Sequence, residues 1–321
     1  MENFTQVRLV SVDNDHTMVG YFAGAVPAWR EQLPVIAAKL GVSTKLVGRA
    51  LGNVFARYGT HDYPWALALA KSLYLDWHGS VETFVEEVER PFWEAMDWYR
   101  LRYITPYRGV KEALGRLSDW GIPVVVVSDA PLFMCIARLV TAGLSRFISG
   151  VYALDCKRPA LPSGVDPEWL RFGDERLATL TADYSNHGIK VVRELPATFE
   201  KPNPCGIQVA LADFGVPPER CVHVGDSLLK DGLLAVNAGL RGFYHTPNHA
   251  IGNLPAEYLE WITEIVVPEF EVSASNKQTT PDCQPPMLGQ GAFGDVLNHL
   301  NFTAGSMTRD LAAISSRLFR A

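Results

Sequence analysis

Short runs of apolar, β-branched residues alternate with longer helical patterns through much of the chain. The run VVVV at 124–127 is bounded by Gly-Ile-Pro and Ser-Asp, which is typical of a buried parallel strand. Further strands are predicted near 7–12, 151–154, 221–224 and 242–246. Because strands that alternate with helices build a parallel sheet covered by helices on both faces, the sequence predicts an α/β fold.

Polar residues follow three of these predicted strands: Asp13, Ser128 and Asp226. The carboxyl ends of parallel strands meet at one edge of a sheet, where ligands bind. Asp13, Asp15 and Thr17 occupy alternate positions, so an extended chain turns them to one side. Taken alone, the two aspartates fit a strand that ends in an Asx-type turn equally well. The agreement among three separate segments favours a ligand site.

Residues 21–104 form a different kind of segment. Apolar residues recur there at intervals of three and four, as in PAWREQLPVIAAKLG and TKLVGRALGNVFARYG, and no strand pattern interrupts them. Its five tryptophans are expected to lie mostly in a small core: Trp29, Trp65, Trp77, Trp93 and Trp98. The sequence therefore predicts an all-helical unit at 21–104, inserted within a core formed by 1–20 and 105–265.

Two further additions to the core are predicted. Residues 155–198 form an insertion with a helical pattern, PEWLRFGDERLATLTADYSN, and a strand pattern, GIKVVREL. Residues 266–321 begin as a polar, proline-containing linker and end with two helix candidates, at 294–302 and 307–320. We favour an extension that packs back on the core. The alternative is a dimerisation arm or a docking helix.

Charge and cysteine usage exclude several classes of protein. The formal net charge is −6 and no extended Lys/Arg run occurs, which speaks against nucleic acid or an anionic membrane as a partner. No apolar run approaches the ~18 residues of a membrane span, and the first residues lack the pattern of a secretory signal. The five cysteines are scattered and never form a CxxC pair, so we expect reduced thiols and a cytoplasmic location.

One motif is misleading. The segment LGQGAFGDV at 288–296 matches the glycine-rich loop of protein kinases, and an Asp-Phe-Gly occurs at 213–215. The Asp-Phe-Gly precedes the glycine loop instead of following it, and too few residues remain for the rest of a kinase. We interpret Gly215 as a helix stop and the glycines near 290 as a turn in the C-terminal extension.

Four motifs occur in a fixed order: VDNDHT at 12–17, VVVVSDA at 124–130, EKPNP at 200–204 and VGDSLLKD at 224–231. This set resembles the haloacid dehalogenase-like hydrolase superfamily, most of whose members are magnesium-dependent phosphatases. The resemblance covers about 7–154 and 199–250. It implies a Rossmann-like parallel sheet core with an all-helical type-1 cap, residues 21–104, over the carboxyl ends of the strands.

The resemblance also implies a role for each motif residue. Asp13 would be the nucleophile, and Asp15 the acid/base that protonates the leaving oxygen and later takes a proton from water. Mg²⁺ would be the cofactor, bound by oxygen ligands because it prefers them. Asp13, Asp226 and the Asp15 backbone carbonyl would bind the metal ion. Asp231 would bind the metal through water or orient Lys201. Ser128, Lys201 and Thr17 would form the phosphate site, in which Thr17 braces the turn.

The sequence thus predicts a Mg²⁺-dependent phosphatase that acts on a small phosphorylated metabolite through an aspartyl-phosphate intermediate. A phosphomutase or phosphotransferase with the same nucleophile is the first alternative. A dehalogenase is less favoured, because the family's true dehalogenases generally lack the second aspartate, here Asp15. A non-catalytic phosphate-binding scaffold is the remaining alternative, and the intact set of charged residues argues against it. A homodimer through the cap or the C-terminal extension stays open.

The first motif departs from the family pattern at His16, where many members have glycine. The backbone turns tightly there, so we expect a left-handed conformation at His16. We favour a harmless substitution over a contact with substrate. In the predicted cap, four residues could contact the substrate and could equally well lie on the solvated surface: Arg30, Arg49, Arg57 and His61.

Overall fold

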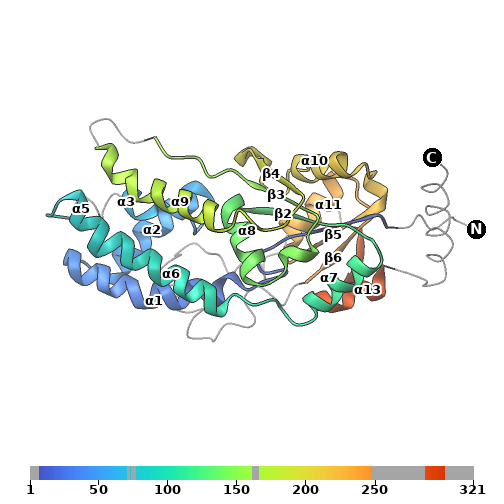
Figure 1. The fold of residues 1–321 in the computed structure, drawn as a ribbon, viewed down its shortest axis with the longest axis horizontal. Coiled ribbons are helices and arrows are strands. Elements are labelled where there is room, and N and C mark those ends of the chain that lie inside the picture. Colours follow the sequence, from blue (N-terminus) through green and yellow to red (C-terminus); the bar gives the residue numbers. More distant parts are fainter. Residues whose placement is uncertain (1–6, 71–72, 74–76, 161–165, 247–285, 301–321) are drawn as a thin grey trace, which may run out of the picture.

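The computed structural model describes residues 7–70, 73, 77–160, 166–246 and 286–300 (Figure 1). Its centre is one seven-stranded sheet in which every pair of neighbours is parallel, in the order β4-β3-β2-β1-β5-β6-β7. The strands are β1 (Leu9–Val12), β2 (Val124–Pro131), β3 (Gly150–Leu154), β4 (Val191–Leu195), β5 (Cys221–Gly225), β6 (Gly242–His245) and β7 (Met287–Gln290). The expected parallel α/β fold is confirmed.

The middle of the sheet is buried on both faces. Val10 on β1 pairs with Val124 on β2 and with Val222 on β5, and all three side chains are at most 1% exposed. Continuous apolar runs of this kind are typical of strands that are covered on both sides. They explain why the run at 124–127 is a reliable strand signal.

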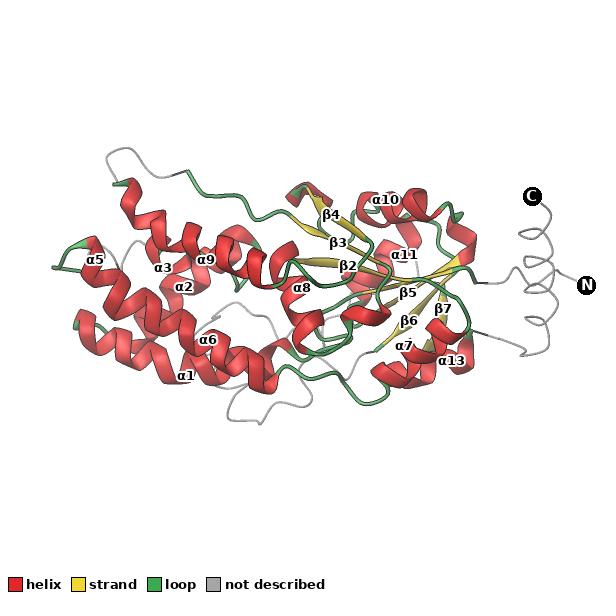
Figure 2. Cartoon of the chain, in the orientation of Figure 1, coloured by secondary structure: helices red, strands yellow, loops and turns green. Residues whose placement is uncertain are grey.

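Helices cover the two faces of the sheet. On one face, α7 (Val110–Asp119) and α8 (Leu132–Thr141) pack against β1 and β2. On the other face lie α10 (Cys205–Phe214) and α11 (Leu233–Asn237). Figure 2 shows this layered arrangement. Short 3-10 turns complete the core as η2 (Ser145–Phe147), η4 (Ala197–Phe199) and η5 (Pro218–Arg220), and a π turn follows β5 as η6 (Leu228–Gly232).

Residues 21–103 form a group of helices at the end of the molecule toward which the strands point, which we call the helical lobe (Figure 1). It contains α1 (Tyr21–Leu40), α2 (Thr44–Tyr58), α3 (Ala66–Leu69), α5 (Val81–Phe84), the π turn η1 (Val85–Glu89) and α6 (Arg90–Tyr103). Ser43 caps α2, because its side chain accepts a hydrogen bond from the Leu46 backbone. The helical character of this segment agrees with the sequence pattern.

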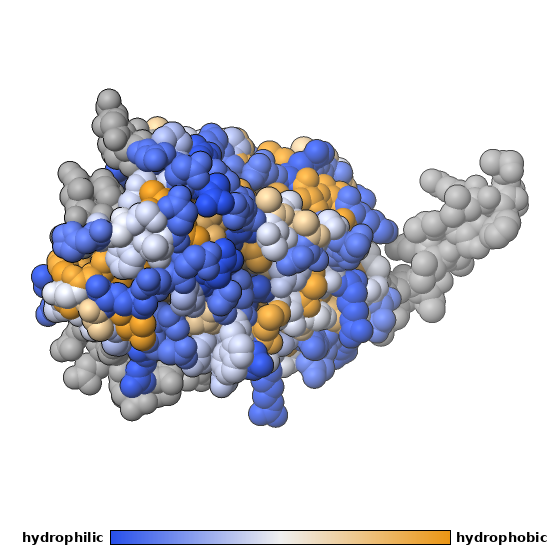
Figure 3. Space-filling view, turned by 60° about the vertical axis from the view of Figure 1, so that its left-hand side comes forward, coloured by the Kyte–Doolittle hydropathy of each residue, from blue (hydrophilic) through white to orange (hydrophobic). Residues whose placement is uncertain are grey.

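The lobe has its own apolar core. Trp29, Trp65 and Trp93 are at most 1% exposed, and helices α1 and α6 pack along each other. Trp98, in contrast, is 45% exposed. The outer surface of the lobe is largely hydrophilic with scattered hydrophobic patches (Figure 3). None of the helices in the described ranges is both long and apolar enough to cross a bilayer.

The predicted insertion at 155–198 contributes to two parts of the molecule. Its described residues include η3 (Pro167–Leu170) and α9 (Arg171–Asp183), which pack against the lobe and against α8. Trp65 of the lobe donates a hydrogen bond of 3.0 Å to Asp174 on α9. The strand pattern GIKVVREL forms β4, which is the edge strand beside β3.

The glycine-rich segment near 290 is not a simple turn, and our expectation there is wrong. Met287–Gln290 forms β7, which pairs in parallel with β6. It is followed by η9 (Phe293–Asp295) and α13 (Val296–His299), whose apolar side chains are buried against the core. A β-carbon on Gly109 would come within 2.9 Å of Gly294, so this segment packs backbone to backbone on the start of α7. The helix candidate at 307–320 lies outside the described residues.

Candidate active site

The first motif begins where β1 ends. The backbone of Asp13 donates a hydrogen bond of 2.9 Å to Val224 on the neighbouring β5, which ties the motif to the middle of the sheet. The Asp13 side chain is 9% exposed. Thr17 donates from its hydroxyl to Asp13 Oδ2 at 3.4 Å, so the threonine braces the turn as expected. The nucleophile candidate therefore has a fixed position at the carboxyl end of a central strand.

Lys201 is brought to Asp13 from the loop before α10. Its Nζ lies 2.6 Å from Asp13 Oδ1 and 2.7 Å from Asp231 Oδ1. The backbone of Lys201 donates to Asp129 Oδ1 at 2.9 Å, which fixes the loop beside β2. Burial alone would lower the pKa of Lys201, but the two carboxylates outweigh it and raise the pKa well above its usual value. The lysine is therefore held as a cation inside the site.

Asp231 is fully engaged by neighbouring donors. Its Oδ1 accepts from Lys201 and lies 3.1 Å from His223 Nε2, and its Oδ2 accepts from the Ser227 backbone at 3.1 Å. Burial would raise its pKa, but Lys201 and His223 reverse the effect and hold the carboxyl below its usual range. Such an arrangement favours orientation of Lys201 over direct binding of a metal.

Asp226 follows β5, and its backbone carbonyl lies 2.9 Å from His245 Nε2. Burial, with repulsion from Asp231, raises its pKa to about 7. Burial also raises the pKa of Asp13 well above its usual value, against the charge of Lys201. Ligand atoms of Asp13, Asp226 and Asp231 all lie within 4.8 Å of one another. Carboxylates that are buried so close together fit a divalent cation with oxygen ligands.

Ser128 lies on the same edge of the sheet. Val12 pairs with Val126 in the register of β1 and β2, so Asp13 and Ser128 both lie just beyond that pair. The Ser128 hydroxyl accepts from the Ala130 backbone at 3.1 Å and is buried. A serine hydroxyl can also donate a hydrogen bond, which suits a group that binds an anion.

Asp15 does not contact Lys201. It forms an ion pair through Oδ2 with Arg138 of α8, and Oδ1 accepts a hydrogen bond of 3.4 Å from Asn14. Burial raises the pKa of Asp15, although the charge of Arg138 opposes the rise. The Asp15 side chain keeps 23% exposure, so the carboxyl can meet a ligand that enters between the sheet and the lobe.

Sequence reasoning missed four residues around these carboxylates: Asp62, Asp129, Arg138 and His223. Arg138 and His223 had a weak signal, since each is a polar residue inside an apolar run, LFMCIARLV and CVHVG. Buried polar groups need partners, so such residues point to a polar neighbour elsewhere in the chain. Asp62 and Asp129 carry no comparable signal.

His16 has the expected left-handed conformation, with φ of 60°, and is the one non-glycine residue in the described ranges with positive φ. Its ring lies 4.8 Å from that of Phe22, and burial lowers its pKa to about 3. In the lobe, Arg30, Arg49 and Arg57 are exposed at the surface. His61 is partly buried among aromatic rings, 4.9 Å from Phe55.

A family model described as haloacid dehalogenase-like hydrolase matches residues 7–239. No curated protein sequence is significantly similar to the chain.

Two solved structures show the same fold. A 2-haloacid dehalogenase from Pseudomonas syringae has a TM-score of 0.51 at 16% identity, covering 92% of this chain and 98% of its own. A protein described as a β-phosphoglucomutase from Thermotoga maritima has a TM-score of 0.50 at 17% identity, covering 91% and 98%. At these identities the likeness concerns the fold alone, whereas the family model spans most of the chain and all four motifs. The chain therefore belongs to the haloacid dehalogenase-like hydrolases.

Proposed function

We propose that this hydrolase is a Mg²⁺-dependent phosphatase that acts on a small phosphorylated metabolite through an aspartyl-phosphate on Asp13. The observation that carries the proposal is the charge arrangement at Asp13. One of its oxygens is held by the Lys201 ammonium at 2.6 Å, and carboxylate oxygens of Asp226 and Asp231 lie within 4.8 Å of an oxygen of Asp13. A nucleophilic carboxylate can attack an anionic phosphate only where positive charge offsets the repulsion.

The residues present fit Mg²⁺. Asp13, Asp226 and the backbone carbonyl of Asp15 would hold the ion, and Asp231 would act through water or through its hold on Lys201. When bound, Mg²⁺ neutralises negative charge on the phosphoryl oxygens and on the carboxylates around them. Burial raises the pKa of both Asp13 and Asp226, so a bound cation would stabilise their ionised forms.

The chain's own residues then account for both chemical steps. In the first, an oxygen of Asp13 forms a bond to phosphorus while the bond from phosphorus to the leaving oxygen breaks, and Asp15 donates its proton to that oxygen. In the second, Asp15 takes a proton from water, the water oxygen attacks phosphorus, and inorganic phosphate leaves with Asp13 restored. Lys201 and the Ser128 hydroxyl bind the phosphoryl oxygens in both steps.

The position of the helical lobe supports a small substrate. The lobe lies over the carboxyl ends of the strands as a cap, and Asp62 of the lobe reaches Arg138 beside Asp15. A lid in this place excludes water and leaves no room for a protein surface. We therefore propose a phosphorylated metabolite as substrate, a cytoplasmic location in keeping with the free thiols of the described cysteines, and no nucleic acid or membrane partner.

A phosphomutase or phosphotransferase with the same nucleophile is the second candidate. It would differ only in the acceptor, a hydroxyl group in place of water, and the fold that this chain shares with the Thermotoga protein is compatible with both. Asp15 disfavours a dehalogenase, because breaking a carbon–halogen bond needs no acid for an oxygen leaving group. A scaffold is disfavoured because it has no use for buried carboxylates beside a buried lysine.

The test is release of inorganic phosphate from p-nitrophenyl phosphate and from a panel of phosphorylated sugars, polyols and hydroxy acids, with Mg²⁺ or with EDTA. We expect turnover that requires Mg²⁺ and is lost in Asp13→Asn. Asp213→Asn is the matched control, since Asp213 on α10 pairs with Arg193 on β4, away from the site. Turnover that survives in EDTA or in Asp13→Asn would refute the proposal, and phosphate transfer only to an added sugar phosphate would replace it with the mutase.

A further inference from the structure

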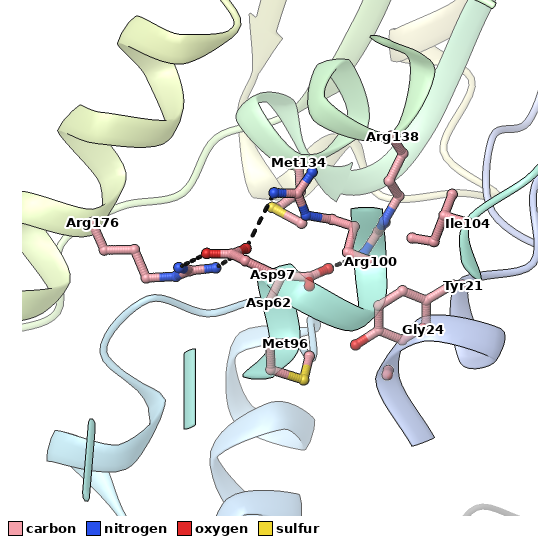
Figure 4. Close-up of a pocket in the computed structure, with 11 residues that line it drawn as sticks. Tyr21, Gly24, Asp62, Met96, Asp97, Arg100, Ile104, Met134, Arg138 and Arg176 are labelled. Atoms are coloured by element: carbon pink, nitrogen blue, oxygen red, sulfur yellow. Dashed lines mark hydrogen bonds and ion pairs between the residues drawn. The ribbon is translucent and has the colours of Figure 1, made fainter. Parts of the chain in front are cut away.

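One buried arginine connects the candidate site to the helical lobe. The guanidinium of Arg138 donates through Nη1 to Asp15 and through Nη2 to Asp62, and its side chain is 1% exposed. Figure 4 shows Arg138 reaching Asp62, with the ring of Tyr21 beside them. Burial alone would lower the pKa of Arg138, but Asp15 and Asp62 raise it, so the group remains charged.

The three partners of Arg138 come from separate parts of the chain. Asp15 lies in the loop after β1, Asp62 lies between α2 and α3 of the lobe, and Tyr21 begins α1. The guanidinium carbon lies 4.4 Å from the centre of the Tyr21 ring. A planar guanidinium that is stacked on a ring and paired with a carboxylate on either side has a fixed orientation.

This orientation determines which oxygen of Asp15 is available. Arg138 holds Oδ2, while Oδ1 accepts only the long hydrogen bond from Asn14 among the described residues. Oδ1 is therefore the oxygen that can exchange a proton with a substrate. Asp62 is itself buried, so the link between Arg138 and the lobe is shielded from solvent and strongly directional.

We propose that Arg138 and Asp62 are positioning residues for Asp15, which give the acid/base its working geometry only while the lobe is seated on the core. The inference rests on the proposed function, in which Asp15 protonates the leaving oxygen. Asp62 belongs to the lobe and Asp15 to the core. Movement of the lobe therefore shifts Asp62, releases one side of the guanidinium and lets the Asp15 carboxyl turn.

A neighbouring cluster provides a matched control. Arg176 of α9 donates to Asp97 at 2.6 and 2.9 Å, and its side chain is 9% exposed. Arg100 joins the same carboxylate at 3.2 Å (Figure 4). All three residues line the same small cavity as Arg138, of about 10 Å³. Arg176 is thus a charged residue with little exposure, like Arg138, and its contacts among the described residues involve neither Asp15 nor Asp62.

The experiment uses the full chain and a series of esters with increasingly poor leaving groups: p-nitrophenyl, phenyl and a simple alkyl phosphate. A nitrophenolate needs no proton to leave, whereas an alkoxide does. We expect Arg138→Lys and Asp62→Asn to lower kcat/KM on the alkyl ester by about tenfold to a hundredfold, which is part of the effect of general acid catalysis. We expect kcat/KM on p-nitrophenyl phosphate, which reports the step in which the leaving group departs, to change by less than about threefold. Arg176→Lys should leave the ratio between the two esters unchanged.

As a second measurement, crystal structures of wild type and Asp62→Asn would show the orientation of the Asp15 carboxyl. A turned Asp15 carboxyl together with the selective loss on poor leaving groups is the expected result. An unchanged ratio in both variants, or an Asp15 that keeps its contacts when Asp62 is replaced, would overturn the inference. If wild type hydrolyses none of the esters, the proposed function fails, and the crystal structures still decide whether Arg138 and Asp62 position Asp15.

Discussion

Gly225 lies directly beneath Asp231. A β-carbon built on Gly225 would come within 2.3 Å of the Asp231 carboxylate carbon, closer than any real contact. The glycine therefore lets Asp231 fold back over the end of β5, where it meets Lys201 and His223. The absence of a side chain at position 225 is thus a requirement for the charged network.

Gly225→Ala tests this relationship. Alanine should push the Asp231 carboxylate off Lys201, with a loss of stability of about 3 kcal/mol for a broken buried ion pair and a loss of kcat/KM of about a hundredfold or more. Gly115→Ala on α7 is the control, because its β-carbon would meet Phe147 at 3.9 Å, an ordinary contact. Urea unfolding and phosphatase assays give the two readouts. A fully active, equally stable Gly225→Ala would contradict the packing argument.

Lys201→Met should abolish most of the activity. The variant leaves Asp13 and Asp231 without their shared cation and removes a donor for the phosphoryl group, which we expect to lower kcat/KM by about a thousandfold. Lys39→Met removes a lysine that pairs with Glu87 at the surface and should have almost no effect. Steady-state kinetics with saturating Mg²⁺ makes the comparison, and equal losses in the two variants would argue against the role of Lys201.

The stability of the chain should depend on pH through Glu89 in the helical lobe. Burial raises the pKa of Glu89 to about 8, against the opposite influence of the Ala68 backbone. The unfolded chain has the ordinary value of 4.5. The folded state binds the Glu89 proton more tightly than the unfolded state does. The contribution of protonated Glu89 to the free energy of unfolding is therefore fully present below pH 4.5. It is lost as the pH rises to 8, by at most about 5 kcal/mol.

Urea unfolding of wild type and Glu89→Gln at pH 5, 6.5 and 8.5 tests this dependence. Glutamine cannot ionise, so the difference in the free energy of unfolding should grow in favour of the variant as the pH rises. Glu87→Gln, at an exposed position, should show no such trend. If the free energies of unfolding of wild type and Glu89→Gln differ by the same amount at all three pH values, the raised pKa of Glu89 is refuted.

His16→Gly separates a tolerated substitution from a substrate contact. Glycine accepts the φ of 60° without strain, which gains about 1 kcal/mol, and loses the contact with Phe22, which costs a similar amount. We therefore expect thermal stability and kcat/KM to stay close to wild type. A loss of kcat/KM beyond about tenfold in a stable variant would identify His16 as a substrate contact.

The local patterns of the sequence predicted the core of the fold and most of the motif residues. The valines before Ser128 and the alternate placing of Asp13 and Asp15 are signals that need no tertiary information. The strand at Met287–Gln290 escaped notice because its glycines resemble a turn and its partner, β6, lies about forty residues earlier. Asp62 and Arg138 escaped for a related reason, since the sequence does not show which distant charges will meet.

The central claim is that Asp13 becomes phosphorylated during turnover. The most direct measurement is a rapid acid quench of the chain during hydrolysis of its best ester, followed by borohydride reduction and mass spectrometry of the peptide that contains residue 13. We expect residue 13 to be reduced to a homoserine-type product only with substrate and Mg²⁺ present, and never in Asp13→Asn. Sustained Mg²⁺-dependent release of phosphate with an unmodified Asp13 would contradict it.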